Sequence, residues 1–270
     1  MHHPHAPAEV VADSGADLDR RFGGLSRLYG SDGARRIAMA HAVVVGVGGV
    51  GSWAAEALIR SGLGRITLID LDHVAESNIN RQLQALDATL GMAKVVALQE
   101  RFGQINPECL VVPVEDFVDA ENVDALVPAD AQVVLDCCDQ VAAKTAIAAL
   151  CLRRRQLLLM AGAAGGKRHA ERVEHADLSV VTHDPLLAKV RYRLRREHAA
   201  PREGRIGLHC AFSTEPVHRQ APDGQSCEQP SGSGLNCAGY GSSVMVTATM
   251  GMVLASRAVD FLVGQHRAPR

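Results

Sequence analysis

Four glycines and a carboxylate, spaced as in sites that bind phosphorylated nucleotides, occupy residues 46 to 70. The run "GVGGVGS" follows a stretch of valines, and its glycines allow a tight turn that brings backbone N–H groups close to a phosphate. Asp70 ends the next apolar run, where its carboxylate can accept both hydroxyls of a ribose. The glycines are Gly46, Gly48, Gly49 and Gly51. These features alone fit NAD and ATP equally well.

The polar residues that follow Asp70 favour ATP over a dinucleotide. The segment "LIDLDHVAESNINRQ" adds a second acid, Asp72, and then a polar cluster beside the expected phosphate site. The cluster includes Asn78, Asn80 and Arg81. A dehydrogenase has little use for it, because backbone groups hold its pyrophosphate. Chemistry at a phosphate does need such side chains.

A lysine and two more carboxylates extend this pattern along the chain. Lys94 lies at the start of an expected helix, where it supplies a cation for a triphosphate. The segment "VLDCCDQ" places Asp136 and Asp139 at the end of a later strand, and a carboxylate there can hold Mg²⁺ against the phosphates. Taken singly, Lys94 could be a solvated helix residue and Asp139 a helix N-cap. Their occurrence together and in this order predicts a site for ATP, with a carboxylate at this strand end available to Mg²⁺.

Alternating strands and helices must position these residues. Short branched apolar runs predict strands, and segments with apolar residues at helical spacing predict the helices between them. The strands are expected at 43–47, 65–70, 110–114, 132–136 and 157–162, and the helices at 53–59, 94–105, after Asp119 and at 142–153. This pattern predicts an α/β fold with a doubly wound, mostly parallel, Rossmann-like sheet, whose ligands bind at the carboxyl ends of the strands.

The pattern also divides the chain into three parts. Residues 1–17 are expected to be a disordered leader, and residues 18–162 the nucleotide-binding core. Residues 163–270 are expected to form a C-terminal extension that packs on the core and shapes the substrate site. Within it, a polar loop is expected at 219–236. The apolar segment 237–263 is long enough to span a membrane, but its Gly, Ser and Thr content favours a core helix.

Composition excludes several classes of protein. The net charge of −2 points to no particular partner, and the N-terminus lacks the basic and apolar regions of a secretory signal. The seven cysteines include no C-x-x-C pair, so neither a disulfide framework nor a four-cysteine zinc site is expected. We therefore expect a cytoplasmic protein with reduced thiols and no membrane partner.

The ordered series "GVGGVGS", "LIDLDHVAESNINRQ", "GMAKV", "INPE" and "LDCCDQ" resembles the E1-like (ThiF-type) adenylating superfamily, whose members activate a carboxylate with ATP. The resemblance implies that ATP and Mg²⁺ are bound by the residues matching Gly49, Asp70, Arg81, Lys94 and Asp139, with Arg81 and Lys94 at the phosphates. In this superfamily an arginine near the N-terminus commonly reaches into the neighbouring subunit's site. Arg27 is the nearest match, with Arg21 as an alternative, and this implies a homodimer.

A second set of segments resembles one branch, the tRNA threonylcarbamoyladenosine dehydratases. It consists of "RFGGLSRLYG", "GVGGVGSWAAEALIRSG", "DPLLAKVRYRLR", "CAFSTEP" and "VTATMG". The resemblance implies that the carboxylate of N6-threonylcarbamoyladenosine (t6A), at position 37 of tRNA, is adenylated and then cyclised with loss of water. Proteins of a sulfurtransferase system are further candidate partners.

Two other functions compete with this one. The first is adenylation of the C-terminus of a sulfur-carrier or ubiquitin-like protein, whose enzymes often carry two C-x-x-C zinc pairs or a thioester cysteine. Those pairs are absent, and Cys210, Cys227 and Cys237 have no assigned role; Cys210, in "LHCAF", is expected to be a buried apolar residue. The second is a non-enzymatic module that senses a dinucleotide, which would bind NAD and tolerate loss of Arg81.

A basic segment at 189–205 offers an independent indication of a nucleic-acid partner. In a helix, Lys189, Arg193 and Arg196 would share one face, with Tyr192 available to stack on a base. Composition alone fits a solvated basic helix equally well. The resemblance favours tRNA.

Overall fold

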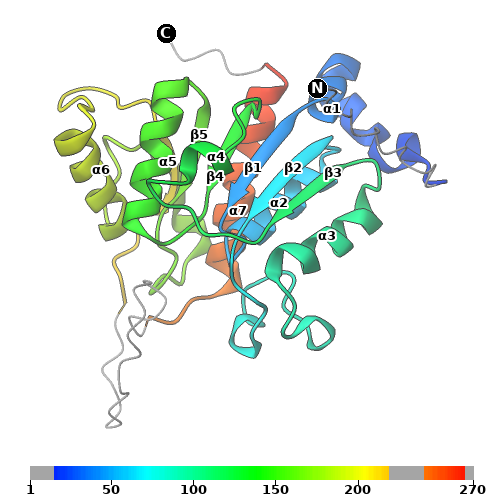
Figure 1. Cartoon of the computed structure of the whole chain (residues 1–270), viewed down its shortest axis with the longest axis horizontal. Coiled ribbons are helices and arrows are strands. Elements are labelled where there is room, and N and C mark those ends of the chain that lie inside the picture. The colour runs from blue at the N-terminus through cyan, green and yellow to red at the C-terminus, as the bar shows by residue number, and fades with distance from the viewer. Residues whose placement is uncertain (1–14, 219–239, 265–270) are drawn as a thin grey trace, which may run out of the picture.

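Seven strands form one twisted sheet with helices on both faces (Figure 1). The computed structural model describes residues 15–218 and 240–264. The strand order is β3-β2-β1-β4-β5-β7-β6, and every neighbouring pair is parallel except β6 and β7. The predicted doubly wound, mostly parallel sheet is confirmed. Its order reverses between β1 and β4, which is where such sheets bind their ligands.

The first five strands lie where the apolar runs predicted them, within about two residues. They are β1 (His41–Val45), β2 (Arg65–Ile69), β3 (Leu110–Val114), β4 (Val133–Asp136) and β5 (Leu157–Ala161). The sequence did not predict the last two, β6 (Val173–Asp177) and β7 (His209–Ser213). β7 pairs with β5 and β6 pairs with β7, so the chain beyond residue 162 continues the same sheet.

The helices cover the two faces of the sheet in separate groups (Figure 1). One face carries α2 (Gly51–Arg60), α3 (Lys94–Ile105) and α7 (Val244–Leu262), with α1 (Leu18–Ala38) at its margin. The other carries α4 (Val123–Leu126), α5 (Val141–Arg154) and α6 (Pro185–Glu197). Short 3-10 turns lie at Glu76–Asn78, Asp87–Thr89 and Ala170–Arg172. The polar loop and the leader, apart from residues 15–17, lie outside the described residues.

Side chains alternate along each strand, so every strand contributes apolar residues to the cores on both faces of the sheet. In β1, Ala42 and Val44 pack toward α2 and α7, whereas Val43 and Val45 pack toward α5. All five residues of β1 are buried, as expected for the central strand of a parallel sheet that is covered on both faces. The carboxyl end of β1 therefore has a rigid position at the centre of the molecule.

The apolar C-terminal segment forms α7, which packs on α2 and on β5, β6 and β7. By length and composition α7 could also cross a membrane, with a mean hydropathy of 1.3 and 44% of its most apolar window buried. Its inward residues include Val246, Met250 and Leu254, all fully buried. Met245 and Met252 are exposed on its outer side. The segment thus forms the predicted helix, with one side buried in the core and the other side exposed.

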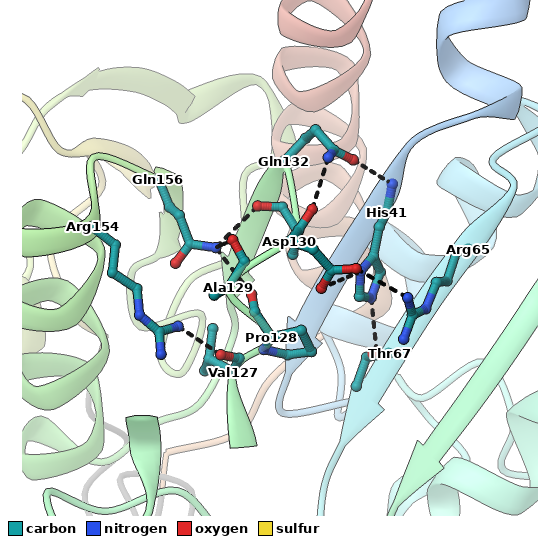
Figure 2. Close-up of polar contacts among 11 residues, drawn as sticks. His41, Arg65, Thr67, Val127, Pro128, Ala129, Asp130, Gln132, Arg154 and Gln156 are labelled. Carbon is teal, nitrogen blue, oxygen red and sulfur yellow. Dashed lines mark hydrogen bonds and ion pairs between the residues drawn. The ribbon is translucent and has the colours of Figure 1, made fainter. Parts of the chain in front are cut away.

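A polar cluster ties together the amino ends of the central strands, at the edge opposite the glycine-rich turn (Figure 2). Buried His41 contacts Thr67 Oγ1 at 2.9 Å and lies 3.5 Å from a carboxylate oxygen of Asp130. Asp130 also accepts a hydrogen bond from Arg65 at 3.1 Å, and Gln132 accepts one from the backbone N–H of His41. This cluster links β1 and β2 to the loop before β4.

Candidate active site

A cavity of about 660 Å³ opens at the carboxyl ends of the strands. Most of the residues predicted to bind a nucleotide line it. They are Gly46, Gly48, Gly49, Asp70, Asp72, Arg81, Lys94 and Asp139. They come from the ends of three strands, the loop after β2 and the start of α3, so the fold gathers groups up to 93 residues apart in the sequence into one site.

Two glycines of the turn after β1 have no room for a side chain. Gly46 has a φ of +81°, and a Cβ there would lie 2.8 Å from the backbone nitrogen of Cys138. Gly51 does not line the cavity, but a Cβ on it would overlap the carbonyl oxygen of Gly46. The turn leads directly into α2, whose N-cap residue, Val50, provides no side-chain hydrogen bond. Backbone N–H groups at this helix end can therefore bind an anion.

Asp70 lies at the carboxyl end of β2 and supports the turn. Its carboxylate accepts hydrogen bonds from the backbone N–H groups of Val47 at 2.7 Å and of Asp72 at 2.9 Å. Burial raises the pKa of Asp70, while nearby Lys94 and these donors oppose the rise. A carboxylate has about four acceptor positions, so two remain for the hydroxyls of a ribose.

Lys94 and Asp72 form an ion pair inside the cavity. Lys94 Nζ lies 2.7 Å from an Asp72 carboxylate oxygen, and the side chain of Lys94 is 6% exposed while that of Asp72 is 73% exposed. The backbone supports this pairing, because Lys94 N–H donates to the carbonyl of Asp72 at 3.0 Å. The lysine is held at the nucleotide side of the cavity by a partner that water can reach.

Arg81 is fixed at both its ends. Its guanidinium donates to the carbonyl of Ser77 at 2.7 Å and to the side-chain oxygen of Asn80 at 2.8 Å. Its own carbonyl accepts a hydrogen bond from the indole N–H of Trp53 at 3.0 Å, which joins the loop to α2. The loop therefore presents a cation whose position is set before any ligand binds.

Besides Gly51, three predicted residues lie outside the cavity wall. Asn78 is buried, and its side-chain oxygen accepts from the backbone N–H of Ala75, so it shapes the loop. Asn80 orients Arg81 and donates to the carbonyl of Ser242 at 2.9 Å. Arg27 is exposed on α1, away from the cavity of its own chain. The alternative, Arg21, donates to the carbonyls of Gln104 and Ile105 at the end of α3.

The two carboxylates after β4 have different surroundings. Asp136 is fully buried and pairs at 3.0 Å with Lys144, which is also fully buried. Although burial opposes the charge on Lys144, Asp136 and the neighbouring Cys138 and Cys137 raise its pKa. Asp139 instead lines the cavity and remains available to a ligand. Asp136 therefore belongs to the support beneath the site, and the sequence did not predict its partner.

The thiols of the described chain are poor nucleophiles. Cys137 and Cys138 line the cavity, and burial raises the pKa of Cys137 to about 12 and that of Cys138 well above its usual value. Cys210 is fully buried in β7, as predicted, and burial raises its pKa as well. Only the thiolate attacks efficiently, so these surroundings disfavour a role as a thioester nucleophile. Cys227 and Cys237 lie outside the described residues.

Sequence reasoning missed several residues in the cavity wall and behind it. Asp184, which is buried, accepts from the backbone N–H groups of Leu187 at 2.9 Å and Ala163 at 2.8 Å. It thereby caps α6 and fixes the turn after β5. Its position before Pro185 is a typical helix start, so the cap was detectable in the sequence. Tyr240 and Phe117, which line the cavity, follow no local pattern.

The basic face expected near residue 189 is present on α6. Lys189, Arg193 and Arg196 are exposed, as is the side chain of Tyr192, and Lys189 also lines the cavity. Arg191 points elsewhere and donates to the carbonyls of the turn after β6. The exposed basic face therefore begins at the cavity and runs away from it along the helix.

Comparison with known proteins places the chain among adenylating enzymes. The model of the ThiF family matches residues 19–270. The chain is 43% identical over 253 residues to the tRNA threonylcarbamoyladenosine dehydratase of Escherichia coli, covering 91% of this chain and 94% of that protein. The corresponding Haemophilus influenzae protein is 40% identical over 251 residues, covering 92% and 95%. The crystal structure of the E. coli enzyme in complex with ATP has a TM-score of 0.83 and 40% identity, covering 95% of this chain and 98% of that one.

Proposed function

The chain belongs to the ThiF family, and on that premise we propose that it is an ATP-dependent tRNA threonylcarbamoyladenosine dehydratase. The observation that carries this proposal is the single cavity that joins a phosphate-binding turn, a ribose-binding carboxylate and two fixed cations. Relatives with the same activity in their names match more than nine-tenths of the chain. The similarity to these relatives therefore includes both the nucleotide site and the extension beyond residue 162.

The first step is adenylation of the substrate carboxylate. An oxygen of the threonylcarbamoyl carboxylate attacks the α-phosphorus of ATP, an O–P bond forms, and the bond to the β-phosphate breaks to release pyrophosphate. The nucleophile is ionised at neutral pH, so no general base is needed. Arg81 and Lys94 reduce the repulsion between the two anions and stabilise the charge that develops on the transferred and leaving groups.

The second step closes the ring. A nucleophilic atom of the threonylcarbamoyl group attacks the activated carbonyl carbon, and the bond to AMP breaks. AMP leaves with one former carboxylate oxygen, and the nucleophile loses its proton. The modified nucleoside is therefore lighter by one water than the starting nucleoside. The neutral thiols of Cys137 and Cys138 take no part.

Asp139 fits the role of a magnesium ligand. Among residues 15–218 and 240–264 no group of three His, Cys, Asp or Glu side chains could hold a metal alone. Mg²⁺ at nucleotide sites usually binds one or two carboxylates together with phosphate oxygens and water, so one cavity carboxylate suffices. Mg²⁺ would neutralise charge on the triphosphate; Asp136 is unsuited because Lys144 already occupies it.

The enzyme acts on tRNA in the cytoplasm, as a homodimer. Exposed cations on α6 supply the phosphate contacts, and Arg27, which its own cavity does not include, reaches the partner's site. The exposed side of α7, with Met245 and Met252, offers apolar surface for the subunit contact. Proteins of a sulfurtransferase system are further candidate partners.

The direct test is a mass measurement on the nucleoside. We expect that incubation with ATP, Mg²⁺ and tRNA bearing t6A yields AMP, pyrophosphate and a nucleoside lighter by one water. An unchanged nucleoside mass would contradict the proposal. Adenylate formation that requires a small protein ending in Gly-Gly, and not tRNA, would identify the enzyme as a sulfur-carrier adenylyltransferase instead.

A further inference from the structure

The cavity continues beyond the residues that a nucleotide requires. On one side of the glycine-rich turn lie Asp70 and Phe117, which suit the ribose and base of ATP. On the other side the cavity extends between the turn after β5, the start of α6 and the segments that flank residues 219–239. This extension, which we call the second arm, is lined by Ala163, Gly165, Leu186, Lys189, Val217 and Tyr240.

Backbone hydrogen bonds connect the walls of the second arm. Gly166 N–H donates to the carbonyl of Gly241, and His218 N–H donates to the carbonyl of Gly166, each at 2.8 Å. Gly166 has a φ of +71°, and a Cβ there would lie 2.8 Å from Val217. Three segments that are distant in sequence thus form the walls of the second arm, and these walls are in place before a ligand binds.

Buried charges anchor the same walls from behind. Lys167 is 2% exposed, and its ammonium group donates to the carbonyls of His183, Ser213 and Glu215. Glu215 is 1% exposed and accepts from the backbone N–H groups of Arg168 and His169. Burial opposes the charge on Glu215, but these donors and the contacting His169 and His218 lower its pKa to about 2. The network fixes the walls without placing its own charges among the residues that line the arm.

The lining suits a flat, mostly apolar group. Tyr240 provides an aromatic ring, Leu186 and Val217 provide aliphatic surface, and the small residues of the turn leave space between them. Lys189 is the cation of the second arm, and it also begins the exposed face that continues through Arg193 to Arg196. At about 1.5 Å per residue these three charges extend roughly 10 Å along α6.

We propose that the second arm binds the modified adenosine after it has swung out of the RNA, with its purine against Tyr240 and its phosphate at Lys189. This inference rests on the proposed function and identifies where the substrate of that function binds. Enzymes that act on a base within RNA must gain access to it, and an aromatic side chain replaces the stacking that the base loses. The next phosphates along the strand lie on Arg193 and Arg196, so the RNA leaves the cavity along α6.

The test separates the base contact from the phosphate contact by using two substrates, the free t6A nucleoside and tRNA that contains it. Replacing Tyr240 by Ala should raise KM roughly ten- to hundred-fold for both substrates, because both present the same purine. Replacing it by Phe should restore KM to about the wild-type value, since the ring is kept. Lys189→Gln should raise KM for tRNA, leave KM for the nucleoside within about twofold, and flatten the dependence of tRNA binding on salt.

Controls distinguish failure of this inference from failure of the proposed function. Arg153→Gln removes an exposed charge from α5 and should change neither KM. ATP binding, followed by quenching of a fluorescent ATP analogue, should stay within about twofold of wild type in the Tyr240 and Lys189 variants. If the wild-type enzyme dehydrates the tRNA but Tyr240→Ala has the same KM as wild type, the second arm does not bind the base. The same conclusion follows if the affinity of Tyr240→Ala for ATP falls by the same factor as its affinity for t6A. If wild type neither binds nor modifies t6A, both proposals fail.

Discussion

Arg81 serves the site through two separate groups. Its guanidinium is a fixed cation on the cavity wall, and its backbone carbonyl accepts from Trp53 and so holds the loop on α2. A side-chain substitution removes the first function and leaves the second intact. The substitution removes the cation and its hydrogen bonds to Ser77 and Asn80, but it keeps the backbone bond that joins the loop to α2.

We predict that Arg81→Ala lowers kcat for adenylation by about 10²- to 10³-fold, as the loss of one preorganised charge-stabilising group does in other enzymes. The unfolding temperature should stay close to that of wild type. Pyrophosphate release and a thermal melt measure the two effects. A variant with normal kcat would show that Arg81 does not act on the phosphates.

The buried pair beneath the site makes an opposite prediction. Lys144→Met leaves the Asp136 carboxylate buried without its partner, and such a loss costs about 3–5 kcal/mol of folding free energy. Urea denaturation should show this as a lower midpoint. Arg153→Gln is the matched control, because its pair with Asp124 is exposed and contributes little. Equal midpoints for the two variants would mean that the buried pair does not support the fold.

The nucleotide side of the site was predictable because its residues are close in sequence to strand ends. A strand followed by "GVGGVGS" fixes where Gly46 must lie, and the next strand end fixes Asp70. Tyr240 and Val217 were not predictable as site residues, because hydrogen bonds between segments more than 50 residues apart place them. The burial of Lys144 was not predictable either, because the sequence does not show that this lysine pairs with buried Asp136.

At the scale of elements, the close crossing of α2 and α7 positions the phosphate-binding turn. A Cβ on Gly251 of α7 would lie 2.6 Å from the carbonyl oxygen of Val50 and 2.9 Å from the nitrogen of Ala54. These are backbone atoms at the start of α2, so they can move only if the helix moves. The packing of α7 against α2 thus helps to set the position of α2 relative to the sheet.

We predict that Gly251→Ala costs about 1–3 kcal/mol of folding free energy, as overpacking usually does, and weakens ATP binding because the start of α2 is displaced. Chemical denaturation and ATP titration measure the two effects. Gly103→Ala is the control: Gly103 lies in α3 with open space around it, and alanine there should stabilise the helix by about 0.5–1 kcal/mol. Unchanged ATP affinity in Gly251→Ala would show that the packing of α7 on α2 does not affect the nucleotide site.

The cluster at the amino ends of the strands predicts a loss of stability in mild acid (Figure 2). Burial, with a contribution from Arg65, lowers the pKa of His41 below 6.5, although Asp130 opposes the shift. The unfolded chain therefore binds a proton that the folded chain does not. The free energy of unfolding should fall as pH drops through 6.5 and continue to fall down to the folded pKa.

Unfolding measured at pH 7.5, 6.0 and 5.0 tests this, and His41→Asn should flatten the slope across that range. Glu215 does not interfere, because its lowered pKa of about 2 places its own loss of stability below about pH 4.5. Identical slopes in wild type and variant would exclude His41 as the source.

Why the sequence predicted five strands and missed two is clear from their settings. β1 to β5 are apolar runs, and this includes β3, "LVVPV", at one edge of the sheet; β6, at the other edge, reads "VEHAD" and is only partly buried. β7 lies within "GLHCAFSTE", where a short apolar run is flanked by polar residues. Polar and charged residues on an edge strand discourage further pairing, and in β6 they remove the apolar signal.

At the scale of the whole molecule, the exposed position of Arg27 predicts complementation between subunits. We expect Arg27→Ala and Arg81→Ala to be nearly inactive alone. If Arg27 acts on the partner's site, mixing and reassociating the two variants restores about a quarter of the wild-type activity, because half the dimers are mixed and each contains one intact site. Steady-state assays of the mixture measure this. No recovery in mixed dimers would place the function of Arg27 elsewhere.

The order of the last strands affects how the protein is made. β7 lies between β5 and β6, although β6 is synthesised first, and α7 covers one face of the sheet only after the last segment appears. A nascent chain that ends before residue 209 carries an unpaired β5 edge and an open apolar face, both of which favour aggregation. The β5 edge is therefore covered only once β7 has been synthesised.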